Sequence, residues 1–183
     1  MVLPQWEVEQ KPCPYTGKVY EKKFDFDIRL NDIESHFKTI IINSPDIGLF
    51  EFGINRSRFD LIRIDCHKRI IRGYEFKISL VDFKRDIKWH HYLPYCNTFT
   101  FVTPYKMITK GDLPSNIGIL QIFKWTYPEC DDFRIGSTWI RKPKTQKMET
   151  EKYIEVISLL LNRVKYRQGD FIAIPKNKDV FID

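Results

Sequence analysis

The chain has 183 residues, of which 43% are hydrophobic and 15% aromatic, and it carries a formal net charge of +6. This composition excludes a disordered tail, and the length fits one domain with a sizeable core. No apolar run approaches the ~20 residues of a membrane span, and the first ten residues show no basic and apolar regions of a signal peptide.

The first thirty residues are expected to form an N-terminal extension with one strand. Residues 1–18 contain four residues that interrupt regular structure, Pro4, Pro12, Pro14 and Gly17. Apolar residues then alternate with charged ones, as in a half-buried strand: Phe24, Phe26, Ile28 and Leu30. A helix is expected from residue 31, and its inward face should carry Ile33, Phe37 and Ile40 or Ile41.

The segment from 31 to 125 is predicted to be the core. Strands are expected at 49–54, 58–65 and 70–79. Ser79 and Asp82 have the spacing of a capping box, which predicts a helix from Ser79 to Pro94 with Leu80, Phe83 and Ile87 facing inward. The next strand, 98–103, should then return beside 70–79, as in α/β folds, and a further strand is expected at 118–125.

The segment from 126 to 183 is expected to pack on this core. It should contain a basic loop around Arg141, an amphipathic helix and a short strand within 171–175. The helix is marked by Ile154, Ile157, Leu160, Leu161 and Val164. If Ile154, Ile157 and Leu161 are exposed, a homodimer becomes plausible.

A candidate site arises where the second and third core strands form a hairpin. A loop of two residues (67–68) or four (66–69) would pair Asp60 with Glu75 and place both on the face of Lys77. A three-residue loop would instead pair Asp60 with Phe76 and bury the acid. The even loops are favoured because Phe59 and Leu61 then share the face of the apolar strand residues. Two carboxylates beside a lysine can hold Mg²⁺ or Mn²⁺ and activate water against a phosphodiester.

The stretch from Glu51 to Gln121 resembles the PD-(D/E)XK nuclease superfamily and, within it, the MmcB-type DNA-repair family. The matching residues are Arg58-Phe59-Asp60, Tyr74 to Ser79, Asp82-Phe83, Asp86, Lys88-Trp89, Tyr92, Cys96-Asn97, Phe101-Val102, Leu113-Pro114 and Gly118-Ile119-Leu120. The resemblance implies a restriction-endonuclease-like α/β fold, a mixed sheet flanked by helices in a single domain. It also implies that Asp60 and Glu75 are the metal-binding acids and Lys77 the catalytic lysine. Asn97 departs from the family, which tends to have Asp there.

The remaining metal ligands are assigned by position. The backbone carbonyl of Phe76 is the expected third ligand. Glu51 and Glu34 compete for the role of a further upstream acid, and Glu51 is favoured. Glu51 would lie opposite Ile62 if a tight turn forms at 56–57.

Basic and aromatic residues around this site are candidates for binding nucleic acid. Lys84, Lys88 and Tyr92 are spaced by four and would share a helix face. Arg58 precedes the first acid, and a further basic cluster, Arg141, Lys142 and Lys144, could follow a phosphate backbone.

The sequence therefore predicts a metal-dependent nuclease acting on DNA, without a motif that reads base sequence. Branched, nicked or single-stranded DNA is the expected substrate, in repair or replication. Two alternatives remain open: a catalytically silent nucleic-acid-binding scaffold, and an RNA-processing nuclease that uses a metal-free His/Tyr/Lys set. The cysteines (13, 66, 96 and 130) lack C-x-x-C spacing, which favours reduced thiols and a cytoplasmic location.

Overall fold

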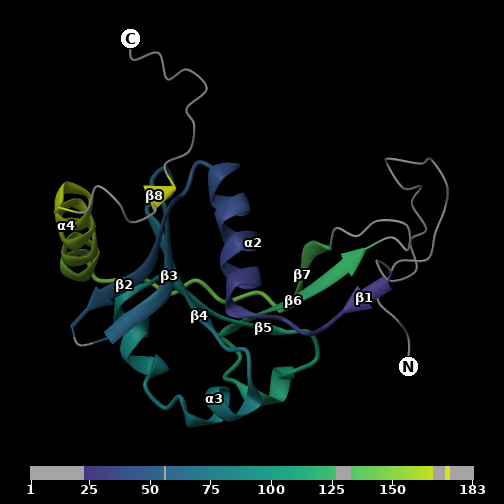
Figure 1. Ribbon diagram of the computed structural model, residues 1–183. Coiled ribbons are helices and arrows are strands. Elements are labelled where there is room, and N and C mark those ends of the chain that lie inside the picture. Colours follow the sequence, from purple (N-terminus) through teal and green to yellow (C-terminus); the bar gives the residue numbers. More distant parts are fainter. Residues whose placement is uncertain (1–22, 56, 127–132, 167–171, 174–183) are drawn as a thin grey trace.

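Three antiparallel strands and two parallel ones form the centre of the sheet in a computed structural model, which describes residues 23–55, 57–126, 133–166 and 172–173 (Figure 1). The antiparallel meander consists of β2 (Ile47–Ile54), β3 (Ser57–Asp65) and β4 (Ile70–Phe76). Next to β4 lie β5 (Thr98–Pro104) and β6 (Gly118–Thr126), each parallel to its neighbour. The expected mixed α/β sheet is confirmed.

Short strands extend the sheet at both edges. The edge strands are β1 (Lys23–Asp25) and β7 (Arg134–Arg141), which both pair with β6, and β8 (Ile172–Ala173), which pairs with β2. The described strands thus form one eight-stranded sheet in the order β1-β6-β5-β4-β3-β2-β8, with β7 off this path. The sequence analysis missed β7 because its polar residues alternate with only a few apolar ones.

Helices cover both faces of this sheet. The long helices are α2 (Leu30–Ile42) and α4 (Thr150–Tyr166), and the short ones are α3 (Leu80–Arg85) and the 3₁₀ segments η1 (Trp89–Tyr95) and η2 (Lys110–Asp112). On one face, α2 packs with its buried residues Ile33, Phe37 and Ile41, as predicted. On the other face, Val156 and Leu160 of α4 join the core cluster that includes residues of η1. No helix in the described part of the chain is long and apolar enough to cross a membrane.

The N-terminal strand is shorter than expected. The prediction of a strand through residue 30 is wrong, because β1 ends at Asp25 and α2 already begins at Leu30. The local cause is the start of the helix, where the Arg29 N–H donates to Oδ2 of Asp32 at 2.8 Å. Such a bond satisfies a backbone donor that has no partner inside the helix.

The helix after β4 is also shorter than expected. Ser79 caps α3 by accepting a hydrogen bond from the Asp82 N–H at 3.1 Å, as predicted. The helix nevertheless ends at Arg85, because Asp86 at its C-cap has extended backbone and directs its carboxylate to Lys77. The chain then resumes as η1, which contains Pro94.

The predicted inward face of this helix is therefore wrong in part. Leu80 and Ile87 are exposed, the latter by 72%. Phe83 does pack inward, and its ring lies 5.4 Å from that of Phe101.

Asn97 ties the start of β5 to the segment after β7. Its Oδ1 accepts from the Ile71 N–H at 2.8 Å, and its Nδ2 donates to the Gln146 carbonyl at 3.2 Å. An aspartate could accept the first bond but could not donate the second. The choice of asparagine at this position therefore has a structural explanation.

Two further expectations concern the surface and the cysteines. On α4, Ile154 and Leu161 are exposed, but Ile157 packs against the core, so the three do not form one exposed face.

Cys66 and Cys96 are free thiols, as expected. Cys13 and Cys130 lie outside the described residues.

Candidate active site

The β3–β4 hairpin has the register that the sequence favoured. Asp65 pairs with Ile70 and Leu61 pairs with Tyr74, so the loop is the four-residue one, 66–69. Asp60 and Glu75 are the next residues beyond the Leu61–Tyr74 pair, and they lie close enough for the charge of Asp60 to raise the pKa of Glu75. The register therefore brings the two acids together at the end of β4.

Asp60 lies where β3 separates from β4. The backbone ladder between the two strands ends at Leu61. Beyond it, the Phe76 N–H donates to Oδ2 of Asp60 at 2.6 Å, so the side chain takes the place of a backbone acceptor. This contact holds one carboxylate oxygen of Asp60 against β4, and the sequence analysis did not predict it.

At Asp60, the side chains of β3 also change from one face of the sheet to the other. Leu61 belongs to the core under α2, whereas Phe59 packs on the opposite face against Tyr92, with ring centroids 4.7 Å apart. The expectation that Phe59 and Leu61 share a face is therefore wrong. Gly73 leaves space for the Phe59 ring on this face, because a Cβ at position 73 would lie 2.4 Å from that ring.

Glu51 on β2 faces this irregular point. Its φ of 54° is in the left-handed region that non-glycine residues rarely adopt. Because Leu49 pairs with Ile62, Glu51 stands across from Asp60, and the predicted position opposite Ile62 is wrong. The turn is one residue earlier than expected, since Ile54 pairs with Ser57.

The structure separates the two candidates for the upstream acid. Glu51 is exposed and forms an ion pair of 2.7 Å with Nε of Arg58, and its charge contributes to raising the pKa of Asp60. Glu34 lies on α2 and pairs with Lys38 at 3.5 Å. Of the two, Glu51 is the acid whose charge acts on the site.

Lys77 lies at the centre of an ionic cluster. Its ammonium donates to Oε1 of Glu75 at 3.0 Å and lies 2.9 Å from Oδ2 of Asp86. Asp82 approaches to 3.6 Å but is largely exposed. The side chains of Lys77, Glu75 and Asp86 are each only 8–10% exposed. We call Asp60, Glu75, Lys77 and Asp86 the Lys77 cluster.

Burial and mutual repulsion shift the acids of this cluster. Burial raises the pKa of Asp60 to about 6, against the hydrogen bond from Phe76. Burial, together with the negative charge of Asp60, raises the pKa of Glu75 to about 8. Burial opposes the charged form of Lys77, but hydrogen bonds to Asp86 and Glu75 outweigh it and raise the pKa of the lysine. Acids with raised pKa values beside a charged lysine are typical of functional sites.

One atom of the cluster lacks a partner. Oε2 of Glu75 is buried and accepts no hydrogen bond from the described residues. Leaving a carboxylate oxygen buried in this way is costly, and a bound cation would satisfy it. The described residues contain no group of three or more His, Cys, Asp or Glu side chains placed to hold a metal. The donor set fits Mg²⁺ best, because that ion commonly uses one or two carboxylates and keeps several waters.

Asp86 is one of the residues that carry the family resemblance, but no role was predicted for it from the sequence. Asp82 and Asp86 are four residues apart, a spacing that places two acids on one side of a helix. That spacing directly after Lys77 was the available signal. Asp86 reaches Lys77 only because α3 folds back over the end of β4, and this tertiary arrangement could not be predicted from the sequence.

The predicted helix face of Lys84, Lys88 and Tyr92 does not exist. Lys84 lies on α3 and Lys88 lies beyond its end, both exposed, whereas Tyr92 is buried in the core. The Tyr92 hydroxyl donates to the carbonyl of Arg58 at 3.0 Å. Tyr92 therefore supports the backbone beside Asp60, and its assignment to nucleic-acid binding is wrong.

The basic cluster after β7 has mixed roles. Arg141 ends β7, and its guanidinium donates to four backbone carbonyls, those of Lys110, Leu113, Pro114 and Ile117, at 2.7–3.1 Å. Its assignment to a loop that follows a phosphate backbone is therefore wrong. Lys142 and Lys144 are exposed and remain available for contact with a ligand.

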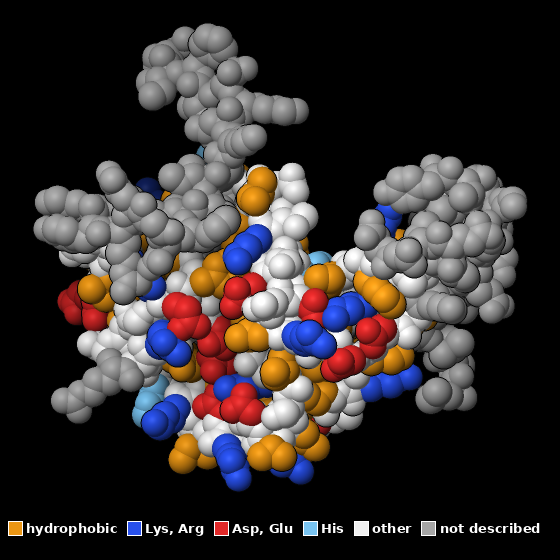
Figure 2. Space-filling model, viewed as in Figure 1, with side chains coloured by type: hydrophobic (Ala, Val, Ile, Leu, Met, Phe, Trp, Pro, Cys, Tyr) orange, Lys and Arg blue, Asp and Glu red, His pale blue; other side chains and the backbone are white. Residues whose placement is uncertain are grey.

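An apolar and basic surface lies beside the cluster. Its large exposed apolar residues come from the chain directly after Lys77, namely Ile78, Leu80, Val81 and Ile87. Figure 2 shows hydrophobic side chains interspersed with Lys and Arg at the lower edge of the molecule, over α3. We call residues 78–88 the α3 rim.

Comparisons with known proteins show the fold and no activity. No family model matches the sequence, and no curated protein matches it. Among solved structures, the chain is similar to SPO1766, a protein of unknown function from Silicibacter pomeroyi, with a TM-score of 0.53 and 19% sequence identity. The match covers 81% of this chain and 97% of that one. At this identity, the likeness supports the α/β architecture alone.

Proposed function

We propose that this protein is a metal-dependent nuclease of the PD-(D/E)XK type that hydrolyses DNA. The observation that carries the proposal is the Lys77 cluster. Asp60 and Glu75 come from adjacent strands and meet at the end of β4, and Lys77 lies two residues further along the chain. The proximity of these two acids and the lysine supports the proposal, because the motif requires an acid, a second acid and a lysine in one site.

The chemistry of the donors supports a divalent cation. Asp60, Glu75 through its unpartnered oxygen, and the backbone carbonyl of Phe76 are the groups that would hold Mg²⁺ or Mn²⁺. When bound, such an ion supplies an activated water and polarises a phosphate oxygen. Lys77 contributes a positive charge, held in place by Glu75 and Asp86, that would stabilise negative charge developing on the phosphate.

The surroundings of the cluster favour nucleic acid as the substrate. The net charge of +6 suits a polyanion, and Lys84, Lys88 and Arg58 are exposed close by in the sequence. The exposed aliphatic side chains of the α3 rim could make apolar contacts with unstacked bases, as inserted Leu and Ile side chains do, which favours branched or single-stranded DNA over intact duplex. We place this activity in cytoplasmic DNA repair or replication. A homodimer is an optional part of the proposal.

The proposal is tested by incubating the purified protein with labelled duplex, single-stranded, flap and four-way-junction DNA, in Mn²⁺ or EDTA. The expected result is Mn²⁺-dependent cleavage that Asp60→Asn abolishes. Binding without cleavage on every substrate would favour a silent scaffold of the same fold. Cleavage of RNA that resists EDTA would favour a metal-free RNA nuclease.

A further inference from the structure

A pocket lies on the sheet face opposite the Lys77 cluster. Arg72 and Tyr74 of β4 line it, and successive strand residues point to opposite faces, so the side chain of Glu75 leaves by the other face. The pocket has a volume of about 390 Å³. It is bounded by β3 to β5, by Asp46 after α2, and by the end of β7 with the residues that follow it.

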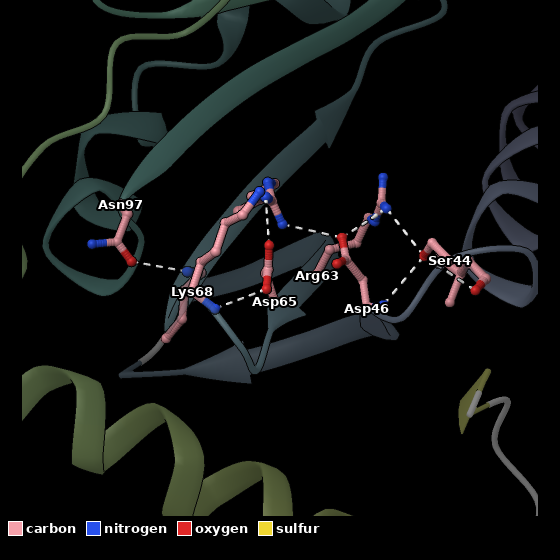
Figure 3. Close-up of polar contacts among 9 residues, drawn as sticks. Ser44, Asp46, Arg63, Asp65, Lys68 and Asn97 are labelled. Carbon is pink, nitrogen blue, oxygen red and sulfur yellow. Dashed lines mark hydrogen bonds and ion pairs between the residues drawn. The ribbon is translucent and has the colours of Figure 1, made fainter. Parts of the chain in front are cut away.

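Arginines and a shared carboxylate form one wall. Nη2 of Arg63 lies 2.7 Å from Oδ2 of Asp46, and Nη1 of Arg72 lies 3.1 Å from the same oxygen. Arg72 also reaches Asp65 at 3.3 Å. Figure 3 shows Arg63 next to Asp46 and Ser44, with which its guanidinium forms hydrogen bonds. The arginines are thus held in fixed positions, as a binding site requires.

This wall retains capacity to donate hydrogen bonds. Nε of Arg63 is buried and has no hydrogen-bond partner among the described residues. An arginine has five N–H donors, and a buried donor without a partner is costly. The ion pairs with Asp46 and Asp65 occupy only part of the donors of Arg63 and Arg72, and an anion in the pocket would accept hydrogen bonds from donors that remain.

The charge of the pocket also favours an anion. Arg63, Arg72 and Lys142 line it, and among the described lining residues Asp46 is the only carboxylate. Lys142 is exposed and lies at the rim. The lining therefore carries three positive charges against one negative charge, and the balance stays positive when Asp65, the second partner of Arg72, is included.

The rim offers a flat apolar surface. Trp139 of β7 is 41% exposed although it lines the pocket, and Pro143 lies beside it in the lining. A ring system can stack on an indole while an attached anion reaches the arginines. The volume falls in the range of small-molecule sites, about 300–1,000 Å³.

We propose that this pocket binds a nucleoside monophosphate, with the phosphate at Arg63 and Lys142 and the base on Trp139. The same group can come from a free nucleotide or from the 5′-phosphorylated end of a DNA strand. The site is separate from the Lys77 cluster and does not depend on the nuclease proposal.

The test is equilibrium dialysis of the full chain with radiolabelled AMP, in EDTA so that metal-dependent binding elsewhere does not contribute. The account predicts saturable binding that Lys142→Ala and Trp139→Ala each weaken about fivefold or more. The matched control is Lys144→Ala, an exposed lysine two residues along that does not line the pocket. Circular dichroism confirms that each variant is folded.

Competitors identify the ligand chemistry. Adenosine should compete far less well than AMP, because it lacks the phosphate. Inorganic phosphate should also compete less well, because it cannot stack. Two oligonucleotides, one with a 5′-phosphate and one with a 5′-hydroxyl, identify the source of the phosphate. Displacement of AMP by the phosphorylated oligonucleotide alone would identify a DNA end. Failure of both oligonucleotides to displace AMP would identify a free nucleotide. Unchanged AMP binding in both pocket variants, or no AMP binding at millimolar concentration, would overturn the proposal.

Discussion

The ammonium of Lys77 lies 2.9 Å from Oδ2 of Asp86, a residue at the end of the helix that follows β4. With Glu75 at 3.0 Å on its other side, the lysine is held between two buried carboxylates. Asp86 thus fixes the position of the group expected to stabilise charge at the reaction centre. Its role is to position Lys77, and this can be separated from metal binding.

Asp86→Asn should lower the cleavage rate by about tenfold while leaving the affinity for Mn²⁺ nearly unchanged. The amide keeps the shape of the side chain but loses the charge that holds Lys77, and buried charge-assisted bonds contribute about 1.5–3 kcal/mol. Single-turnover cleavage and Mn²⁺ titration measure the two effects. Asp82→Asn is the matched control, since Asp82 is exposed and 3.6 Å away. Equal losses in both variants would argue against a positioning role for Asp86.

Mn²⁺ should raise the melting temperature of the protein, because a ligand that binds only the folded state stabilises it. Glu75→Ala should abolish this shift by removing the unpartnered oxygen. Glu34→Ala should retain it, since Glu34 pairs with Lys38 on α2. Differential scanning fluorimetry with and without EDTA provides the measurement. A shift that survives in Glu75→Ala would place the metal elsewhere.

The stability of the metal-free protein should fall as pH rises from 5 to 8. Burial raises the pKa of Glu75 from 4.5 to about 8, so between these values the folded state binds more protons than the unfolded chain. Stability then decreases with pH, and the contribution is lost once pH exceeds the folded pKa. Asp60 adds to the fall between about 4 and 6.

Glu75→Gln tests this directly, because the amide keeps the hydrogen-bonding oxygen but cannot ionise. In EDTA, its free energy of unfolding relative to the wild type should improve by at least ~1 kcal/mol between pH 5 and pH 8. Urea denaturation at both pH values gives the difference. A constant difference would mean that Glu75 ionises normally in the folded protein.

Arg141→Met should destabilise the fold by about 2–4 kcal/mol, because it leaves four backbone carbonyls without their donor. Lys144→Met should change the free energy of unfolding by less than about 0.5 kcal/mol, as expected for an exposed side chain. Urea denaturation measures both variants. Similar stabilities would show that the Arg141 bonds contribute little.

Strand pairing and the buried faces of helices were predicted correctly from the sequence where they depend on regular spacing of apolar residues. The β3–β4 pairing was predicted correctly although one premise, a shared face for Phe59 and Leu61, was wrong, and the buried face of α2 followed from helical spacing. Alternation failed where the backbone departs from regular geometry. Side chains change face at Glu51 on β2 and at Asp60 on β3, and the residue type of Glu51 does not predict its positive φ. The end of α3 was missed because it depends on Asp86 meeting Lys77, a tertiary contact that outweighs local helix propensity.

The central claim is that the Lys77 cluster cleaves DNA, and the most direct measurement is single-turnover cleavage by Lys77→Ala beside Lys84→Ala. Both variants lose one lysine, but Lys84 is exposed on α3 and lies outside the cluster. With Mn²⁺ and the preferred substrate, the account predicts a loss of at least about a hundredfold for Lys77→Ala, and less than about fivefold for Lys84→Ala. Cleavage by folded Lys77→Ala at the wild-type rate would contradict it.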